Sequence, residues 1–421
     1  MMNKKNKRWY RLDNAGKIFP PTSNEVDPKV FRFACELLED INKEILQKAL
    51  DITIEEYPLF LSSLKKGLFW YYLETSNVKP IVTKENVILC DKMDKDLLFR
   101  VSYFKKRINL EVYHALTDGT GTLLFLKSLV TNYLTIKYDI QDKIILDDSS
   151  IHEKEDNSFE KYYKESTKLK VPKAPKAFYL EGVRYPENRL KLIEGVVSTQ
   201  NILSIAKKYN TTVTIYLTSV LIKSIGKTMS RKEKRKPVVV TIPVNLRKYF
   251  KSNTARNFFN TITVSYRFKD DNENIEQIIE SIDLQFKEKL NKDYLDKEMN
   301  SLSVLENVFL IRLVPVFIKD IVLRYFHNRS RHEQTIALSN IGIVEVPEVL
   351  QKYIKLFDVF TSTDGMQLCM CSYLDQMVLS FTSHFTDSEI QKNFFTELTK
   401  QDVDVTVNTN ELEESRYEEV L

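Results

Sequence analysis

Residues 107–138 read RINLEVYHALTDGTGTLLFLKSLVTNYLTIKY, and this stretch decides the fold that the sequence predicts. Apolar and polar residues alternate over its first seven positions, which predicts a half-buried strand that ends with His114 on its apolar face. The TDGTG segment that follows predicts a turn whose glycines take positive φ. Apolar residues then recur at helical spacing, with Thr120 or Thr122 as the expected N-cap. An imidazole and the Asp118 carboxylate are therefore expected where a strand meets a helix N-terminus.

The motif at this junction resembles the active-site motif of a known enzyme superfamily. His114-Ala-Leu-Thr-Asp118-Gly119 is similar to the HHxxxDG motif of the acyl-CoA-dependent acyltransferases. This superfamily includes chloramphenicol acetyltransferase, the condensation domains of non-ribosomal peptide synthesis, the plant BAHD acyltransferases and the alcohol acetyltransferases. Tyr113 stands where the family motif has the first His of the pair. The second His, which is the general base in that family, is matched by His114.

Two further stretches are similar to the alcohol acetyltransferase-like branch of the superfamily. The first is WYRLDNA at residues 9–15 with KIFP at residues 17–20. The second is PVNLR at residues 243–247, followed by NFF at residues 257–259. The three stretches occur in the expected order and span most of the chain. The DFGWG motif of the BAHD branch is absent from the sequence, which argues against that branch.

The resemblance implies roles for individual residues. His114 is expected to take the proton of an alcohol or amine as it attacks a thioester carbonyl, because a neutral imidazole, with an ordinary pKa of about 6.5, can accept it. The motif Asp pairs with an arginine from the other half in such enzymes, which implies an ion pair between Asp118 and Arg247. Gly119 is expected where the backbone bends beside the site. The alternatives are a core histidine at the end of an apolar strand and a turn-capping aspartate without a partner.

The residue that stabilises the developing oxyanion is less well defined by the sequence. Ser339 and Asn340 are candidate donors, and they lie in a segment that predicts a plain turn. Tyr113 is expected either to pack or to act as a hydroxyl donor in place of the missing His. His327 and His332 lie among three arginines, a cluster that would suit the phosphates of coenzyme A or form a solvated helix end.

Interleaved strands and helices over 421 residues predict an α/β, or layered α+β, class. The resemblance implies two chloramphenicol-acetyltransferase-like domains, each a mixed sheet flanked by helices, with a tunnel between them. We expect an N-terminal half at residues 1–165, a linker at 166–189, where the composition changes, and a C-terminal half at 190–421. Since two such units are fused in one chain, the expected state is a monomer.

Composition excludes several classes of protein. Lys and Arg number 62 and Asp and Glu number 58, so the net charge of +4 does not indicate a nucleic-acid-binding protein. The four cysteines are expected to be buried thiols, and no metal site is expected. The N-terminus is basic without an apolar run, and the most apolar segment, residues 308–323, is too charged to span a bilayer. The expected location is the cytoplasm, with contact to a membrane surface left open by the basic N-terminus.

Together these features predict an acyltransferase that moves an acyl group from an acyl-CoA thioester to an alcohol or amine acceptor, with His114 as general base. Acyl-CoA would be a co-substrate, and no cofactor is expected. Two alternatives remain open. One is a condensation-type enzyme that takes its acyl group from a carrier protein. The other is a non-catalytic homologue that binds an acyl ligand or a partner protein.

Overall fold

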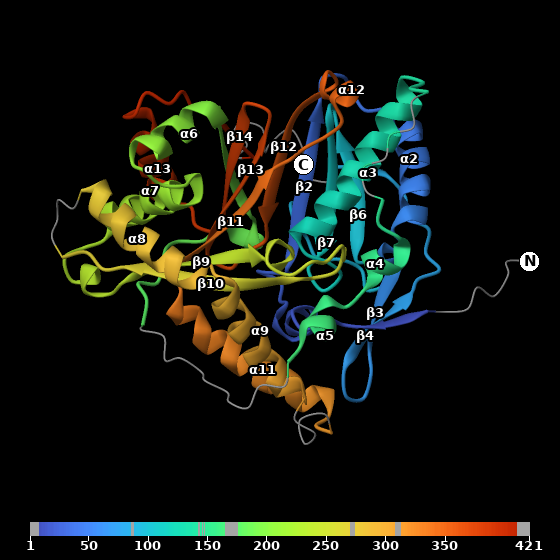
Figure 1. Cartoon of the computed structure of the whole chain (residues 1–421), viewed down its shortest axis with the longest axis horizontal. Coiled ribbons are helices and arrows are strands. Elements are labelled where there is room, and N and C mark those ends of the chain that lie inside the picture. Colours follow the sequence, from blue (N-terminus) through green and yellow to red (C-terminus); the bar gives the residue numbers. More distant parts are fainter. Residues whose placement is uncertain are drawn as a thin grey trace, which may run out of the picture.

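The computed structural model describes residues 8–410, apart from 86–87, 142–143, 145, 147, 165–175, 270–273 and 308–312. Within these residues the chain forms two large mixed sheets and one small sheet, with helices packed on their outer faces (Figure 1). The layered α/β class predicted from the sequence is confirmed. The two large sheets meet along one side. One apolar core belongs to the second sheet and its helices, and the other belongs mainly to the first sheet but also includes Leu192, Cys369 and Tyr373 of the second.

The first large sheet holds the motif strand in its centre. Its strands, in spatial order, are β12 (Ile354–Thr361), β2 (Val30–Leu37), β7 (Arg107–Tyr113), β6 (Phe99–Phe104) and β5 (Thr83–Lys84). The helices α2 (Lys43–Glu56) and α3 (Gly119–Lys137) pack against each other and cover its outer face. The strand β7 is buried on both faces, so packing on both sides fixes the position of its C-terminal end.

The second large sheet is built from later parts of the chain. Its strands, in spatial order, are β10 (Phe259–Tyr266), β9 (Val238–Asn245), β11 (Ile336–Ile343), β13 (Met366–Tyr373), β14 (Gln376–Ser383), β8 (Lys191–Ser198) and β15 (Thr406–Thr409). Its helices are α6 (Thr199–Lys208), α7 (Val213–Thr228), α8 (Ile275–Lys289) and α13 (Glu389–Thr399). The β9–β10 pair extends from this sheet toward the first one (Figure 1).

The remaining elements join and edge these sheets. A small sheet consists of β1 (Trp9–Arg11), β4 (Tyr71–Thr75) and β3 (Ser62–Lys66). The other helices are α1 (Phe19–Thr22), α4 (Ile151–Glu155), α5 (Ser158–Tyr162), α9 (Lys292–Asn307), α11 (Val316–Ser330) and α12 (Glu348–Gln351). Single 3-10 turns occur at Gly16–Ile18, Pro58–Phe60, Pro186–Asn188, Glu233–Arg235, Leu246–Lys248 and Arg331–Glu333.

One strand crosses the division that the sequence predicts at residues 166–189. β12 comes from the later part of the chain, yet it pairs antiparallel with β2 in the first sheet. It also packs against β13 and β14 of the second sheet, so it ties the two sheets together. Residues 166–175 of the predicted linker lie outside the described residues, and the domain boundaries stay a prediction.

Two expectations about the chain's chemistry can be compared with the structure. All four cysteines are free and buried, as predicted. Among the described residues, no helix is both long enough and apolar enough to cross a bilayer. The first five residues of the apolar segment 308–323 lie outside the described part, and the rest leads into α11.

Candidate active site

His114 follows the last residue of β7 and lies in a box of aromatic rings. Its backbone N–H donates to the carbonyl oxygen of Lys29 at 2.9 Å, which fixes the end of the strand. The imidazole stacks on Phe19 with ring centres 4.3 Å apart and planes 17° apart. Phe31 and Phe259 lie 4.8 and 5.5 Å from it, measured between ring centres. The ring is held in one orientation and remains partly exposed.

Asn257 determines which ring nitrogen of His114 carries the hydrogen. Its amide nitrogen Nδ2 donates to the carbonyl oxygen of His114 at 3.2 Å and to Asp13 Oδ2 at 3.3 Å. The amide oxygen Oδ1 therefore faces Nδ1 of His114, 3.2 Å away, where it can only accept. Neutral His114 thus carries its hydrogen on Nδ1, and Nε2 keeps its lone pair. Among the described residues, none forms a hydrogen bond with Nε2.

The protonation state of His114 also suits a base. Burial lowers the pKa of His114 below its ordinary value, and a hydrogen bond to its own backbone, the nearby Asp118 charge and the Asn257 hydrogen bond offset only part of that effect. At neutral pH the imidazole is therefore uncharged. An uncharged ring with a free Nε2 can accept a proton from a hydroxyl or amine that reaches it.

Asp118 and Arg247 form the ion pair that the resemblance implied. Arg247 Nη1 lies 2.8 Å from Asp118 Oδ2, and Nη2 lies 3.2 Å from Oδ1, so the pair is bidentate. Asp118 also accepts from the backbone N–H of Gly121 at 3.0 Å and of Phe258 at 2.8 Å. These four bonds engage both carboxylate oxygens, which leaves Asp118 no free oxygen to orient the ring of His114. Through these bonds Asp118 connects the N-terminus of α3 to the segment between β9 and β10.

Asp118, and not Thr120 or Thr122, is the N-cap of α3. The sequence-based expectation was wrong because Asp118 has extended backbone geometry and its side chain accepts from the third residue of the helix. Thr120 instead accepts from Asn245 Nδ2 at 3.1 Å, which is a second contact between the two sheets' elements.

The motif glycines do not have positive φ, which corrects the expectation, and one of them is required for space. Among the described glycines only Gly342 has positive φ. A Cβ on Gly121 would lie 2.0 Å from the carbonyl oxygen of Ala255 and 2.2 Å from Thr117 Oγ1. A Cβ on Gly119 would meet side chains only, with the flexible tip of Ile341 at 3.0 Å and the Phe33 ring at 3.6 Å. Gly121 is therefore the glycine that allows α3 to approach the second half.

Asp13, in the N-terminal stretch, holds the side chain of Asn257 in place through a hydrogen bond. Asp13 is buried, accepts from the backbone N–H of Gly16 at 2.7 Å, and receives Asn257 Nδ2 on its other oxygen. Arg256 Nε lies 3.8 Å from Asp13 Oδ2. Burial raises the pKa of the Asp13 carboxyl, and Arg256 opposes that rise. Asp13, Asn257 and His114 thus form one chain of contacts across the molecule.

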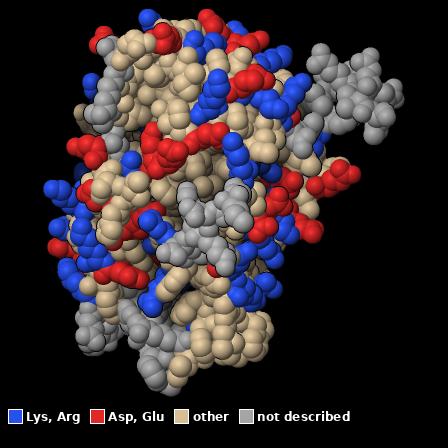
Figure 2. Space-filling view, turned by 90° about the vertical axis from the view of Figure 1, so that its right-hand side faces the viewer, with Lys and Arg blue, Asp and Glu red and all other residues tan. Residues whose placement is uncertain are grey.

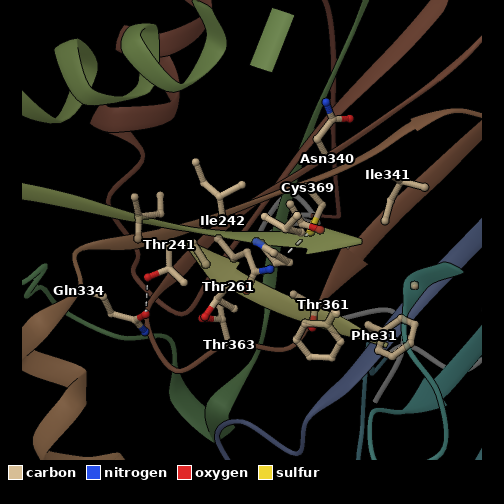
Figure 3. Close-up of a pocket in the computed structure, with 18 of the residues that line it drawn as sticks. Phe31, Thr241, Ile242, Thr261, Gln334, Asn340, Ile341, Thr361, Thr363 and Cys369 are labelled. Carbon is tan, nitrogen blue, oxygen red and sulfur yellow. Dashed lines mark hydrogen bonds between the residues drawn. The ribbon is translucent and has the colours of Figure 1, made fainter. Parts of the chain in front are cut away.

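A cavity of about 930 Å³ opens beside His114, within the range of about 300–1,000 Å³ typical of small-molecule sites. As predicted, its walls come from both parts of the chain. The first part contributes Phe19, Phe31, Phe33, Gly119, Thr120 and Leu123, and the second contributes Thr241, Ile242, Asn245, Phe259, Thr261, Ser339, Asn340 and Ile341, among others. In the close-up, Thr241 and Thr261 project from neighbouring strands, and Thr241 bonds to Gln334 at 3.0 Å (Figure 3).

Two of the three predicted oxyanion or pocket residues do line this cavity. Ser339 and Asn340 lie in β11, not in the predicted turn, and the strand is bulged between Asn340 and Gly342. Gly342, with φ of 88°, adopts the left-handed backbone conformation at the bulge. A glycine at a bulge and a glycine in a turn look alike in the sequence, which explains why a turn was predicted here. Asn340 is already bonded, because Nδ2 donates to Thr214 Oγ1 at 2.8 Å and Oδ1 accepts from Gly342.

Tyr113 is not among the residues that line the cavity, which corrects the expectation that it belongs to the pocket. It points to the other face of β7, as the alternation predicted, and its hydroxyl lies 3.0 Å from Ser23 Oγ. Burial raises the pKa of this phenol well above its ordinary value, so it stays protonated. Its role in the structure is packing.

Of the basic cluster near residue 330, His327 and Arg331 line the cavity, and His332 does not. Burial lowers the pKa of His327. Arg331 Nη2 is paired with Asp364 Oδ2 at 2.5 Å, which uses part of its capacity to bind an anion. The cluster therefore edges the cavity with mixed charge.

Solved structures of other proteins share the fold of this chain. No protein-family model matches the chain, and no curated protein matches it. Among solved structures, trichothecene 15-O-acetyltransferase from Fusarium sporotrichioides is similar at 10% identity and a TM-score of 0.63, over 95% of this chain and 96% of that one. TRI101 from F. sporotrichioides, solved with coenzyme A and T-2, matches at 10% identity and 0.61, over 96% and 100%. The first condensation domain of the calcium-dependent antibiotic synthetase matches at 12% identity and 0.65, over 94% and 97%.

Proposed function

We propose that this chain, which has the two-sheet fold shared by acetyltransferases and condensation domains of the chloramphenicol acetyltransferase-like superfamily, transfers an acyl group from an acyl-CoA thioester to an alcohol. The observation that carries the proposal is the state of His114. Its ring is neutral, it carries its hydrogen on Nδ1, and its free Nε2 lies beside a cavity with walls from both parts of the chain.

In the proposed reaction, Nε2 of His114 accepts the proton of the acceptor hydroxyl as its oxygen attacks the thioester carbonyl carbon. A new C–O bond forms, and the carbonyl electrons move to the oxygen. When the tetrahedral intermediate collapses, the C–S bond breaks and the imidazolium returns its proton to the departing thiolate. The products are an ester and a free thiol. The Asn257 amide oxygen accepts from Nδ1 throughout, which holds the ring and favours the transient imidazolium.

Ser339 is the better of the two proposed donors to the oxyanion. It lines the cavity, and its hydroxyl makes no hydrogen bond with another described residue. Asn340 would have to give up its bond to Thr214 before it could donate. A hydroxyl that is free in the resting chain can turn toward the negative oxygen as the charge develops.

The choice of coenzyme A as donor rests on likeness, and the carrier-protein alternative rests on the same kind of evidence. TRI101, whose structure contains coenzyme A, and the condensation domain of the antibiotic synthetase have similar TM-scores to this chain. The fold alone therefore supports acyl transfer more strongly than it supports either donor. We propose coenzyme A because the two acetyltransferase-like sequence stretches, one near the N-terminus around Asp13 and one in the second half around Asn257, meet at His114 and position it.

The test is an acyl-transfer assay on the purified chain. Acetyl-CoA and longer acyl-CoAs would be mixed with a panel of alcohols and amines, with release of free thiol recorded and the ester or amide identified by mass spectrometry. Thiol release that requires an acceptor is the expected result. Transfer from an acylated carrier protein but not from acyl-CoA would replace the proposed donor. Binding of acyl-CoA without any transfer would support the non-catalytic alternative.

A further inference from the structure

The helix α11 (Val316–Ser330) has two charged residues turned inward. Lys319 and Asp320 are both buried. Lys319 Nζ donates to the carbonyl oxygen of Phe69 at 3.0 Å and lies 3.4 Å from the centre of the Trp70 ring. Asp320 accepts from the hydroxyl of Tyr71 at 2.8 Å. These contacts hold α11 on the hairpin of β3 and β4 by its polar side, which is the reverse of an ordinary surface helix.

The outward side of α11 is apolar. Six large side chains are between 40% and 64% exposed, namely Phe317, Ile318, Ile321, Val322, Tyr325 and Phe326. At about 100° per residue they cover roughly half of the helix circumference. The hairpin turn adds Leu68, which is 69% exposed, and its carbonyl oxygen accepts from the Val316 N–H at 2.8 Å. We call these seven residues the α11 face. A contiguous apolar surface of this kind marks an interaction site.

The charges beside the α11 face are basic. Arg324 and Arg329 are the exposed charged residues of the helix, and its one acid, Asp320, is buried. Lys66 on the hairpin is half exposed and pairs with Asp320 at 3.0 Å, so the charge of that acid is balanced and the basic charge beside the face comes from the two arginines. Figure 2 shows blue and red side chains interspersed over the view and a tan projection at its lower end, where α11 and the hairpin lie in Figure 1. Large apolar side chains with a basic rim suit an interfacial helix on a bilayer that contains anionic lipid.

A second copy of the chain fits this surface less well. A two-fold contact places the same patch on both sides, so the basic rim with Arg324 and Arg329 would face its own copy without an acid on the helix to balance it. Anionic headgroups, by contrast, supply negative charge around an apolar layer. The charge pattern therefore favours a lipid surface over self-association.

The position of α11 connects this surface to the catalytic cavity. His327, in its last turn, and Arg331, just beyond it, both line the cavity beside His114. We propose that the α11 face docks this protein on an anionic phospholipid bilayer. The same helix then borders the bilayer on one side and the cavity on the other, so an apolar acyl chain or lipid alcohol would have a short path to the site. The docking surface does not depend on the proposed acyl-transfer reaction.

The experiment is co-sedimentation of the full chain with large vesicles, either of phosphatidylcholine alone or of equal parts phosphatidylcholine and phosphatidylglycerol. We expect the chain to sediment with the mixed vesicles and more weakly with the neutral ones. Ile321→Glu should lower the partition coefficient for mixed vesicles by about tenfold or more, because an apolar side chain that would enter the bilayer is removed and a negative charge is added.

The matched control is Leu284→Glu on α8, where a single leucine is 62% exposed, against 64% for Ile321. Both variants change the net charge equally, so attraction through the basic N-terminus would weaken both alike. Retained binding by Leu284→Glu and lost binding by Ile321→Glu support the proposal. It is overturned if the parent stays in the supernatant with both vesicle types or if the two variants behave alike. A parent dimer that Ile321→Glu makes monomeric in sedimentation velocity, without vesicle binding, would assign the surface to self-association.

Discussion

We expect Asp118→Asn to destabilise the chain because Asp118 holds the two sheets together at the site. Both carboxylate oxygens are occupied, by Arg247 in a bidentate pair and by the backbone N–H groups of Gly121 and Phe258. The side chains of Asp118 and Arg247 are only 6% and 10% exposed. An asparagine of the same shape can accept on one side only, so its NH₂ group would face donors on the other.

The magnitude follows from what remains after the substitution. Breaking one partner of a buried ion pair costs about 3–5 kcal/mol, because the other charge is left uncompensated. Arg247 would still donate to the carbonyl oxygens of Thr254 and Phe258, at 3.0 and 3.3 Å, so part of its hydration is replaced. The expected loss in the free energy of unfolding is therefore near the lower end, about 3 kcal/mol.

The assay is urea unfolding followed by circular dichroism, with Asp51→Asn as the control. Asp51 pairs with Lys79 at 2.9 Å, but the two side chains are 43% and 67% exposed, so this change should cost about 0–1 kcal/mol. The double variant Asp118→Asn with Arg247→Met should lose less than the sum of its single variants. If Asp118→Asn costs no more than Asp51→Asn, the ion pair does not hold the sheets together and the reasoning fails.

Three further predictions concern positioning, space and pH. Asn257→Ala should lower kcat by up to about 100-fold with a smaller change in KM, because the ring of His114 loses its partner. A rise in KM with kcat unchanged, measured by steady-state kinetics, would assign Asn257 to binding instead. Gly121→Ala should cost about 1–3 kcal/mol in unfolding experiments and Gly119→Ala clearly less, since only the first Cβ would overlap backbone; equal effects would contradict this. Burial and Asp358 raise the pKa of Glu194 from 4.5 to about 9, so between these values the folded chain holds a proton that the unfolded chain has lost, and stability falls as pH rises. Glu194→Gln should flatten that decline and raise Tm at pH 8 relative to the parent, whereas an unchanged pH slope would show that Glu194 is ionised in the folded chain.

Local patterns predicted what depends on neighbours in sequence. The strand before His114, the helix after Asp118 and the opposite direction of Tyr113 all follow from periodicity, and the structure confirms them. The Asp118–Arg247 pair was predicted through resemblance, because no local pattern joins residues so far apart. The mechanistic roles of these residues stay predictions.

Contacts between distant segments were missed for a physical reason. Asn257 and Asp13 lie within stretches that were recognised, yet nothing in either stretch shows that an amide from one would bind a carboxylate from the other and a histidine between them. The same limit applies to α11. Periodicity can show that a helix has two sides, but only the structure shows that its apolar side, with Ile321, faces outward.

The most direct test of the proposed general base is the rate of acyl transfer by His114→Ala beside that of His152→Ala, whose parent histidine is exposed on α4. We expect His114→Ala to fold normally and to lose about 10²–10⁴ in rate, because the variant lacks the imidazole that lies against Phe31 and Phe259 and accepts the proton. His152→Ala should match the parent. Turnover by His114→Ala at the parent rate would contradict the proposal that this residue removes the acceptor's proton.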